Sequence, residues 1–236
     1  MIYHYDLHIH SVLSPCADVL MTPNNIINMA HLKGLNLISI TDHNSLKQYP
    51  VIDEIMKSYD MLLIYGVEVE LVDKSHILCY LKTLEDALNF DLFLEKNLVK
   101  QEYDRKTYGE QVITDLYDQE AQVIEYHLGK STKLTLEDLQ NELTKYDHLL
   151  FLAHVDRAKN SGYHLLNNHL FDGVELSRHA SLSWKESMKE QKRHILQSSD
   201  AHTLTDILER DEKNMIEMEE LSIQQFFHVM KYGRPE

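Results

Sequence analysis

The sequence contains little glycine, proline or cysteine: 7, 4 and 2 residues respectively among 236. Because no stretch is rich in glycine, serine or proline, we find no linker and expect one domain over residues 1–236. A single α/β barrel domain routinely reaches this length. Two cysteines are too few for a disulfide scaffold, which favours a reducing compartment, the cytoplasm.

Long apolar runs and an excess of positive charge are also missing. No run approaches the roughly 18 residues of a membrane span, and the opening MIYHYDLHIHS lacks the basic and apolar parts of a signal peptide, so we expect a cytoplasmic protein without a membrane partner. The 38 acidic and 23 basic residues give a formal net charge of -15, which repels long nucleic acids. Bound cations would reverse this charge locally, so the expected partner is a small phosphorylated substrate or short nucleotide.

Two common catalytic motifs are absent. The sequence has no G-x-S-x-G nucleophile elbow and no P-loop, which argues against a serine hydrolase of that type and against a P-loop nucleotidase. Histidine, in contrast, is abundant, with 15 residues. We therefore expect the histidines and acidic residues to carry the chemistry of the protein.

The predicted elements alternate along the chain. Strands are predicted at residues 1–10, 35–41, 61–71, 75–81, 148–155, 171–177 and 194–201, and helices at 22–34, 50–60, 181–191 and 222–233. Residues 84–146 are predicted to form a largely helical insertion, and Thr22 and Pro23 to begin the first helix. Alternating strands and helices predict parallel strands in an α/β fold, and the number of units favours a small barrel.

Metal-binding or charged residues stand at the ends of nearly all predicted strands. They are His8, His10, Asp42, His43, Glu68, Glu70, His154, Glu175, Arg178, Asp200 and His202, with His76 opening a strand. In α/β barrels the functional residues gather at the carboxyl ends of the strands. We therefore expect these side chains to meet in one site.

The H-x-H pair illustrates the argument. Alternate strand residues share a face, so His8 and His10 lie beside Asp6 and could chelate one ion. Alone, the pair also fits an edge strand with incidental histidines. Repetition of such motifs at four strand ends favours a metal site, in which Asp42 would orient a ligating histidine.

The donor set indicates which ions would bind. Mixed histidine and carboxylate ligands suit Zn, Mn or Fe, and the candidate ligands outnumber what one ion can use, so we expect two or three divalent ions. Paired metals clamp phosphoester oxygens and activate a water between them. The predicted attacking group is therefore a metal-bound water.

Six motifs, DLHIHS, TDHNS, GVEVE, SHILCYL, LAHVDR and SSDAH, run in this order from residue 6 to residue 202. Together they resemble the PHP family, named for polymerase and histidinol phosphatase. The resemblance implies a metal-dependent phosphoesterase with a distorted (β/α)7 barrel and a trinuclear metal site at the carboxyl ends of its strands.

The resemblance also implies a ligand set. The first metal would be held by His8, His10, Glu68 and Asp200, the second by His43, His202 and one loop residue, and the third by His76 and His154 with Glu68 as the bridge. Glu68 is chosen over Glu70 because it occupies the family's G-x-E position.

The loop ligand is where this sequence departs from the family. Many members have HSxxSDG, whereas SPCAD stands here. Counted back from Pro23, Asp18 takes the place of the aspartate, and counted forward from His8, Cys16 falls where some members have a histidine. We favour Asp18 because a carboxylate suits a hydrolytic metal better than a thiolate does. Cys16 would then be a small buried apolar residue.

Three further residues are candidates for substrate binding or catalysis. Arg157 and Arg178 follow strand ends, and a guanidinium group could bind the substrate phosphate through two oxygens. Each arginine could equally form a surface ion pair. His179 is next to Arg178 and is a possible general acid.

The leading hypothesis is a metal-dependent phosphoesterase or phosphatase, a phosphoric ester hydrolase that acts on a small molecule. Alternatives are a nuclease for oligonucleotides or nucleotide bisphosphates, histidinol phosphatase, an amide hydrolase, and a catalytically silent metal-bound module. Retention of the expected ligands, apart from the ambiguous loop residue, disfavours the silent module. The sequence leaves the substrate and the oligomeric state open.

Overall fold

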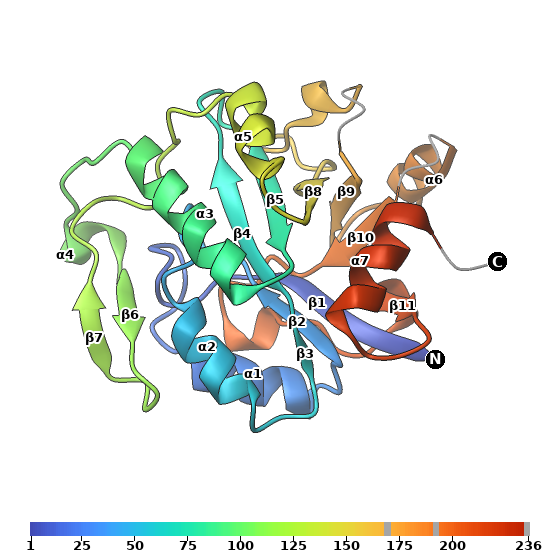
Figure 1. The fold of residues 1–236 in the computed structure, drawn as a ribbon, viewed down its shortest axis with the longest axis horizontal. Helices are drawn as coiled ribbons and strands as arrows, with labels where there is room; N and C mark the ends of the chain where they lie inside the picture. Colours follow the sequence, from blue (N-terminus) through green and yellow to red (C-terminus); the bar gives the residue numbers. More distant parts are fainter. Residues whose placement is uncertain (168–170, 191–193, 234–236) are drawn as a thin grey trace.

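The computed structural model describes residues 1–167, 171–190 and 194–233. Two sheets form the centre of the molecule (Figure 1). The four-stranded sheet has the order β11-β1-β2-β3, and its strands are β1 (Ile2–Ile9), β2 (Leu37–Ile40), β3 (Leu62–Leu63) and β11 (Met215–Glu217). The five-stranded sheet has the order β10-β9-β8-β5-β4, and its strands are β4 (Tyr65–Glu70), β5 (His76–Leu81), β8 (His148–Leu152), β9 (Gly173–Ser177) and β10 (His194–Ser198). The fold is therefore mixed α/β, as predicted.

Two isolated bridges connect the sheets. Ile9, at the end of β1, pairs with Ala201 beyond β10, and His43 beyond β2 pairs with Glu68 of β4. Three of the four residues end or follow a strand, and Glu68 lies in the second half of β4. The bridges bring the carboxyl ends of β1, β2, β4 and β10 together.

The prediction that the strands are parallel is wrong around β5. The β4–β5 and β5–β8 pairs are antiparallel, whereas β1–β2, β8–β9 and β9–β10 are parallel. Only residues 71–75 separate β4 from β5, and a parallel pair would need a much longer crossover. Since β5 is reversed, His76 at its start lies opposite Glu70 at the end of β4.

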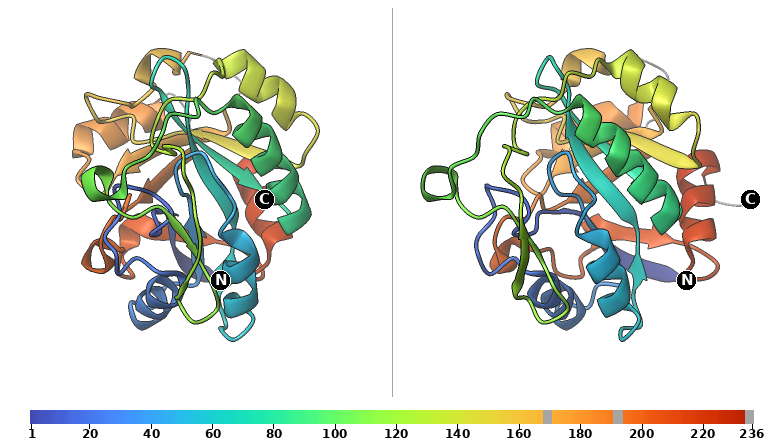
Figure 2. Two further views of the ribbon diagram at one scale, coloured as in Figure 1. Left: turned by 90° about the vertical axis from the view of Figure 1, so that its left-hand side faces the viewer. Right: turned by 60° about the vertical axis from the view of Figure 1, so that its left-hand side comes forward.

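The helices pack around the sheets (Figure 1). They are α1 (Pro23–Leu32), α2 (Tyr49–Met56), α3 (Leu84–Asn97), α5 (Leu136–Leu143), α6 (Leu182–Glu190) and α7 (Ile223–Tyr232). The predicted start of α1 is confirmed, with Thr22 in an extended N-cap conformation and Pro23 opening the helix. Figure 2 shows α3 packed across β4 and β5.

The segment 84–146 is less helical than predicted. Besides α3 and α5 it contains a single turn, α4 (Arg105–Tyr108), and an antiparallel hairpin of β6 (Val112–Thr114) and β7 (Glu120–Val123). Both strands are short, and β7 is polar, so they lack the apolar alternation that would reveal them. The hairpin contacts the loop after β1, where the Val112 amide donates to the Val12 carbonyl.

Apolar side chains form two large clusters. One lies between the strands and the outer helices. The other, here called the α7 cluster, joins α7 to the sheets and includes Tyr80, Phe151, Phe226, Phe227 and Met230. Tyr80 also donates a hydrogen bond from its hydroxyl to the Leu7 carbonyl at 2.9 Å. This cluster therefore anchors the strand that carries His8.

Candidate metal centre

Ligand-type atoms from both ends of the chain meet where β1 and β10 finish. The inner group consists of His8, His10 and Asp200, whose candidate ligand atoms all lie within 4.8 Å of one another. Asp200 Oδ1 is 3.2 Å from His8 Nε2 and 3.0 Å from His10 Nε2, and the two Nε2 atoms are 3.1 Å apart. These three residues were predicted to lie together, and the structure brings them together.

Glu68 is the centre of the middle group, which it forms with His43 and His76. Its Oε1 is 2.7 Å from His76 Nδ1 and 3.1 Å from His154 Nε2, and its Oε2 is 3.0 Å from His43 Nδ1. Burial alone would raise the pKa of Glu68, but His76 and His8 hold the pKa well below its usual value. The carboxylate, 1% exposed, is thus shared among several imidazoles.

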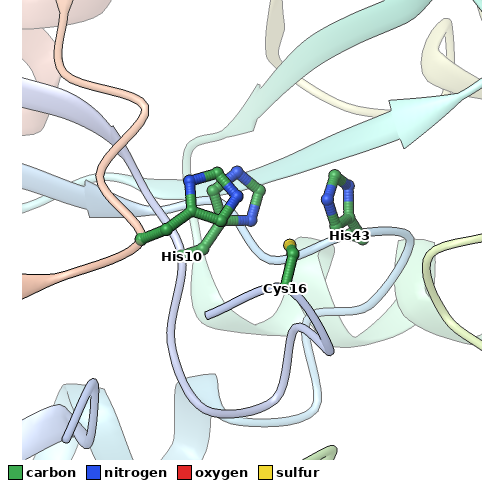
Figure 3. Close-up of side chains that lie close together, drawn as sticks. His10, Cys16 and His43 are labelled. Carbon is green, nitrogen blue, oxygen red and sulfur yellow. The ribbon is translucent and has the colours of Figure 1, made fainter. Parts of the chain in front are cut away.

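The outer group contains His10, Cys16, His43 and His202, again with ligand atoms within 4.8 Å of one another. In Figure 3 the Cys16 sulfur points toward the space between the His10 and His43 rings. Desolvation raises the pKa of the Cys16 thiol, but hydrogen bonds with His202 and His43 outweigh it and bring the pKa to about 7.

The expected placement of Asp18 is corrected by this geometry. Asp18 is exposed, and its Oδ1 accepts a hydrogen bond from the Leu20 amide at 2.8 Å, within its own turn. It belongs to none of the three groups, whereas Cys16 belongs to one. The expectation that Cys16 is a buried apolar residue is also wrong, since it is exposed.

Side chains behind the histidines fix their orientation. His8 Nδ1 donates to the Glu175 carboxylate, with 3.0 Å to each oxygen. His10 Nδ1 lies 3.1 Å from Ser14 Oγ, whose own hydrogen goes to Asp42 Oδ1 at 2.6 Å. Asp42, predicted to orient a histidine, thus reaches His10 through Ser14. We did not predict roles for Glu175 or Ser14, although Glu175 was visible at the end of a predicted strand.

Asp6 holds the loop that carries Asp200 and His202. Its carboxylate accepts hydrogen bonds from the Ser199 amide at 3.0 Å and the Leu208 amide at 2.9 Å. Burial raises the pKa of Asp6 to about 6 in spite of these bonds. The acidic residue before the H-x-H pair therefore positions its partners at the far end of the chain.

The backbone is left-handed at three residues of this region. The φ angles are 54° at Asn44, 30° at His154 and 53° at Asp200. Asparagine and aspartate visit this conformation more readily than other residues, but histidine carries a larger penalty. Such angles store about 1–3 kcal/mol each and are concentrated at functional sites.

Divalent cations fit these residues. His8 Nδ1 and His10 Nδ1 are turned to hydrogen-bond partners, so both rings direct their Nε2 atoms, 3.1 Å apart, toward the same point. Several buried polar atoms of the described residues lie close to one another but make no well-aligned hydrogen bond: Glu68 Oε2, Asp200 Oδ1, His43 Nδ1 and His154 Nδ1. Converging imidazole nitrogens and carboxylate oxygens without an aligned donor suit a positive ion between them. We refer to the three groups with His154 as the candidate metal centre.

A cavity of about 530 Å³ opens over the centre. Arg157 and Lys159 are part of its lining, and Arg157 Nη1 is paired with Asp200 Oδ2. Lys159 was not predicted, because a lysine in a loop gives no specific signal. The structure thus places Arg157, but not Arg178, at the cavity.

Arg178 and His179 do not line this cavity. Arg178 pairs with Asp206 Oδ1 at 2.7 Å and donates from Nε to His179 Nε2 at 3.0 Å. The prediction that they contact the substrate is therefore not supported by their positions. Arg178 forms the ion pair that was the alternative to phosphate binding.

The sequence was compared with known protein families. Residues 6–203 match the PHP domain family. The chain belongs to this family. PHP membership, together with the histidine, aspartate and glutamate groups, supports a metal-dependent hydrolase whose metals and substrate are open. No curated protein matches this PHP chain.

Several solved structures share the PHP fold of this chain. Lesion-specific endonuclease Q from Pyrococcus furiosus is 22% identical, with a TM-score of 0.73 over 98% of this chain and 56% of that one. Endonuclease Q in complex with a 27-mer duplex that has an abasic lesion at the active site is 21% identical, with a TM-score of 0.68 over 98% and 57%. A candidate metal-dependent phosphoesterase from Bifidobacterium adolescentis is 15% identical, with a TM-score of 0.60 over 96% of both chains.

These likenesses establish the fold of the PHP chain. The chain spans only 56% of the length of the first endonuclease chain it resembles. Among the described residues, none of the helices has the length and apolar character needed to cross a membrane.

Proposed function

We propose that the protein is a metal-dependent phosphoesterase or phosphatase, with residues 1–236 as one PHP-like domain. The observation that carries the proposal is the position of Glu68. Its carboxylate is 1% exposed and lies within 3.4 Å of His8, His10, His43, His76 and His154. One buried carboxylate among so many imidazoles suits a bridge between ions better than a ligand of one ion.

Two or three divalent ions, Zn, Mn or Fe, would be held by the three groups. The inner ion would be bound by His8, His10, Asp200 and Glu68, and the others by His43 with His202 and by His76 with His154. When bound, such ions supply positive charge to phosphoryl oxygens and activate a water molecule. The protein itself fixes the ligands through Glu175, Asp42 and Asp6, as described above.

The cavity favours a small substrate. A volume of about 530 Å³ falls in the range of small-molecule sites. Arg157 and Lys159 supply the positive charge on its lining that would bind phosphate oxygens, and the guanidinium group of Arg157 can bind two of them at once. Asp200 restrains Arg157 through an ion pair, so the guanidinium group already lies over the inner group.

A nuclease is the second candidate. The structural likeness to endonuclease Q, which has been solved with a lesion-containing duplex, favours it. The net charge of -15 opposes contact with a long polyanion, although it allows a short or terminal nucleotide. We therefore place the small-molecule phosphoesterase first.

The decisive experiment measures hydrolysis of an aryl phosphate with Zn, Mn or Fe added. His8→Ala should lower the rate more than ~100-fold, because even residues behind the ligands contribute 10–100-fold. Chelation should have a similar effect, and readdition of metal should restore activity. His31→Ala is the matched control, because His31 is exposed on α1. Full activity of the chelated protein or of His8→Ala would rule the proposal out.

A substrate panel separates the two candidates. Mononucleotides, single-stranded oligonucleotides and a duplex with an abasic site should be compared with small phosphate monoesters under the same metal conditions. We expect the monoesters and mononucleotides to be turned over fastest. Faster cleavage of the duplex or the oligonucleotides would favour the nuclease.

A further inference from the structure

The loop after β1 gives the centre a ligand of a different chemical kind. The Cys16 sulfur and the candidate ligand atoms of His10, His43 and His202 all lie within 4.8 Å of one another. In the same cavity lie Glu68 and Asp200, whose side chains are 1% and 7% exposed and which each carry a buried oxygen without a well-aligned hydrogen bond. A thiol in this position completes a set of ligands and is not an isolated surface cysteine.

The loop has a defined shape that directs Cys16 toward the cavity. The Ala17 amide donates to the Ser14 carbonyl at 3.0 Å, which closes a turn over Pro15 and Cys16. The Asp18 amide donates to the His202 carbonyl at 2.8 Å, which ties the turn to the loop after β10. The backbone therefore holds Cys16 and His202 next to each other without help from a ligand.

The insertion supports the same turn from the other side. A Cβ atom at Gly109 would lie 2.6 Å from the Pro15 carbonyl oxygen, and one at Gly129 would lie 3.2 Å from Pro15 Cγ. Only glycine allows the chain to approach Pro15 so closely at Gly109, where φ is 103°. At Gly109 and Gly129 the chain therefore lies directly against the outer side of the Cys16 turn.

His202 offers a free nitrogen to this position. Its Nδ1 is 2.8 Å from the Asp200 carbonyl oxygen, which leaves Nε2 for a ligand. Asp18, the other loop candidate, has turned its carboxylate to the Leu20 amide.

We propose that Cys16 supplies a thiolate sulfur to the metal ion held by His43 and His202, and that this outer position prefers zinc or cobalt to manganese or magnesium. The proposal rests on the metal-binding part of the proposed function. Thiolate is a soft ligand and selects Zn over Mn and Mg, which prefer carboxylate and water oxygens. The inner position has only nitrogen and oxygen ligands, so the two positions differ in metal preference.

Cobalt(II) provides a direct test, because a sulfur ligand gives a near-ultraviolet charge-transfer band that nitrogen and oxygen ligands do not. The metal-free protein should be titrated with Co(II) while absorbance and bound metal are measured. We expect a band that saturates at one thiolate per chain. Cys16→Ser should remove the band and weaken one cobalt position by at least ~10-fold, by analogy with losses behind metal ligands.

Two control variants make the outcome unambiguous. Asp18→Asn should keep the band, and so should Cys79→Ala, which removes the other cysteine, buried in β5. Cobalt bound without a band, or a band that survives in Cys16→Ser or is lost in Asp18→Asn, would overturn the sulfur ligand while leaving the metal centre. Failure to bind cobalt at all would overturn both this inference and the proposed function.

A second measurement uses the wild-type protein and needs no variant. Cys16 is exposed and can be alkylated with iodoacetamide, while buried Cys79 serves as the internal reference in mass spectrometry. Zinc should slow alkylation of Cys16 by at least ~10-fold, because the thiolate is both the nucleophile and the ligand. Equal rates with and without bound zinc would contradict the proposal.

Metal preference can also be reversed. Cys16→Asp places a carboxylate in the same turn, so the ratio of zinc affinity to manganese affinity should fall by at least ~10-fold. Competition titrations followed by metal analysis measure this ratio. An unchanged ratio would show that Cys16 does not select the metal.

Discussion

His8 and Glu68 in the candidate metal centre are as thoroughly buried as Tyr80 and Phe151 in the α7 cluster, with each residue at most 1% exposed. The α7 cluster is apolar, and the Tyr80 hydroxyl has a backbone acceptor. The candidate metal centre contains closely facing imidazole nitrogens, carboxylate oxygens without a well-aligned hydrogen bond, and left-handed residues. Burial therefore has opposite meanings in the two regions: it stabilises the fold in one, and in the other it keeps ligands poised at a cost in stability.

The largest expected effect is in the α7 cluster. Phe226, fully buried on α7, should cost about 3–5 kcal/mol of unfolding free energy when replaced by alanine. Urea unfolding of the metal-free protein measures this loss. The folded fraction should still bind the wild-type number of metal ions, since Phe226 is not among the candidate ligands. If the number of bound metal ions fell together with stability, the α7 cluster and the candidate metal centre would not be independent.

A change at Glu175, which contacts a candidate ligand, should weaken metal binding more than it lowers stability. Glu175 accepts hydrogen bonds from His8 Nδ1 and the His154 amide, each at 3.0 Å. Glu175→Gln should weaken zinc binding about 10–100-fold, because the amide orients His8 less well than the carboxylate. Glu137→Gln, on the exposed surface of α5, is the control. Isothermal titration should show the loss, and unchanged affinity would mean that Glu175 is only structural.

The smallest effect concerns a partly exposed ion pair between Lys47 and Glu95. A hydrogen bond from Lys47 lowers the pKa of Glu95 to about 2 from 4.5, and the side chain is 32% exposed. Because the folded pKa lies below the unfolded value, Glu95 stabilises the fold above pH 4.5 and loses this contribution as the pH falls toward 2.

Solvent screening limits that contribution to less than ~1 kcal/mol. Between pH 5 and about pH 2.5, the wild-type protein should therefore lose slightly more stability than Glu95→Gln. Urea unfolding at several pH values measures the difference. An equal pH dependence in both proteins would show that the Lys47 pair contributes nothing measurable.

The sequence predicted the centre better than its surroundings. His8, His10 and Glu68 could be placed because strand residues alternate and because α/β folds collect strand ends. The reversal of β5 was missed, although the short connection at residues 71–75 held the signal. The hairpin was missed because its strands are too short and polar for a periodic pattern.

The positions of Cys16 and Asp18 could not be read from the sequence for a different reason. Counting back from Pro23 favoured Asp18, whereas the chain turns after Ser14 and is joined to His202 by the Asp18 amide, which leaves Cys16 beside the histidines. The bond to His202 depends on a residue from the far end of the sequence. The choice between phosphate binding and an ion pair for Arg178 also depends on a distant residue, Asp206, with which Arg178 forms an ion pair away from the cavity.

The left-handed backbone at His154 and Asp200 has a consequence for how the site can evolve. At these two points the residue proposed to offer a ligand atom is also the residue that must tolerate an unfavourable φ. Glycine would relieve the backbone at either position and would remove the proposed ligand in the same step. If the proposed function holds, then in a lineage released from selection for it the substitutions that stabilise the fold are the ones that would dismantle the site, and activity lost in this way would be hard to regain.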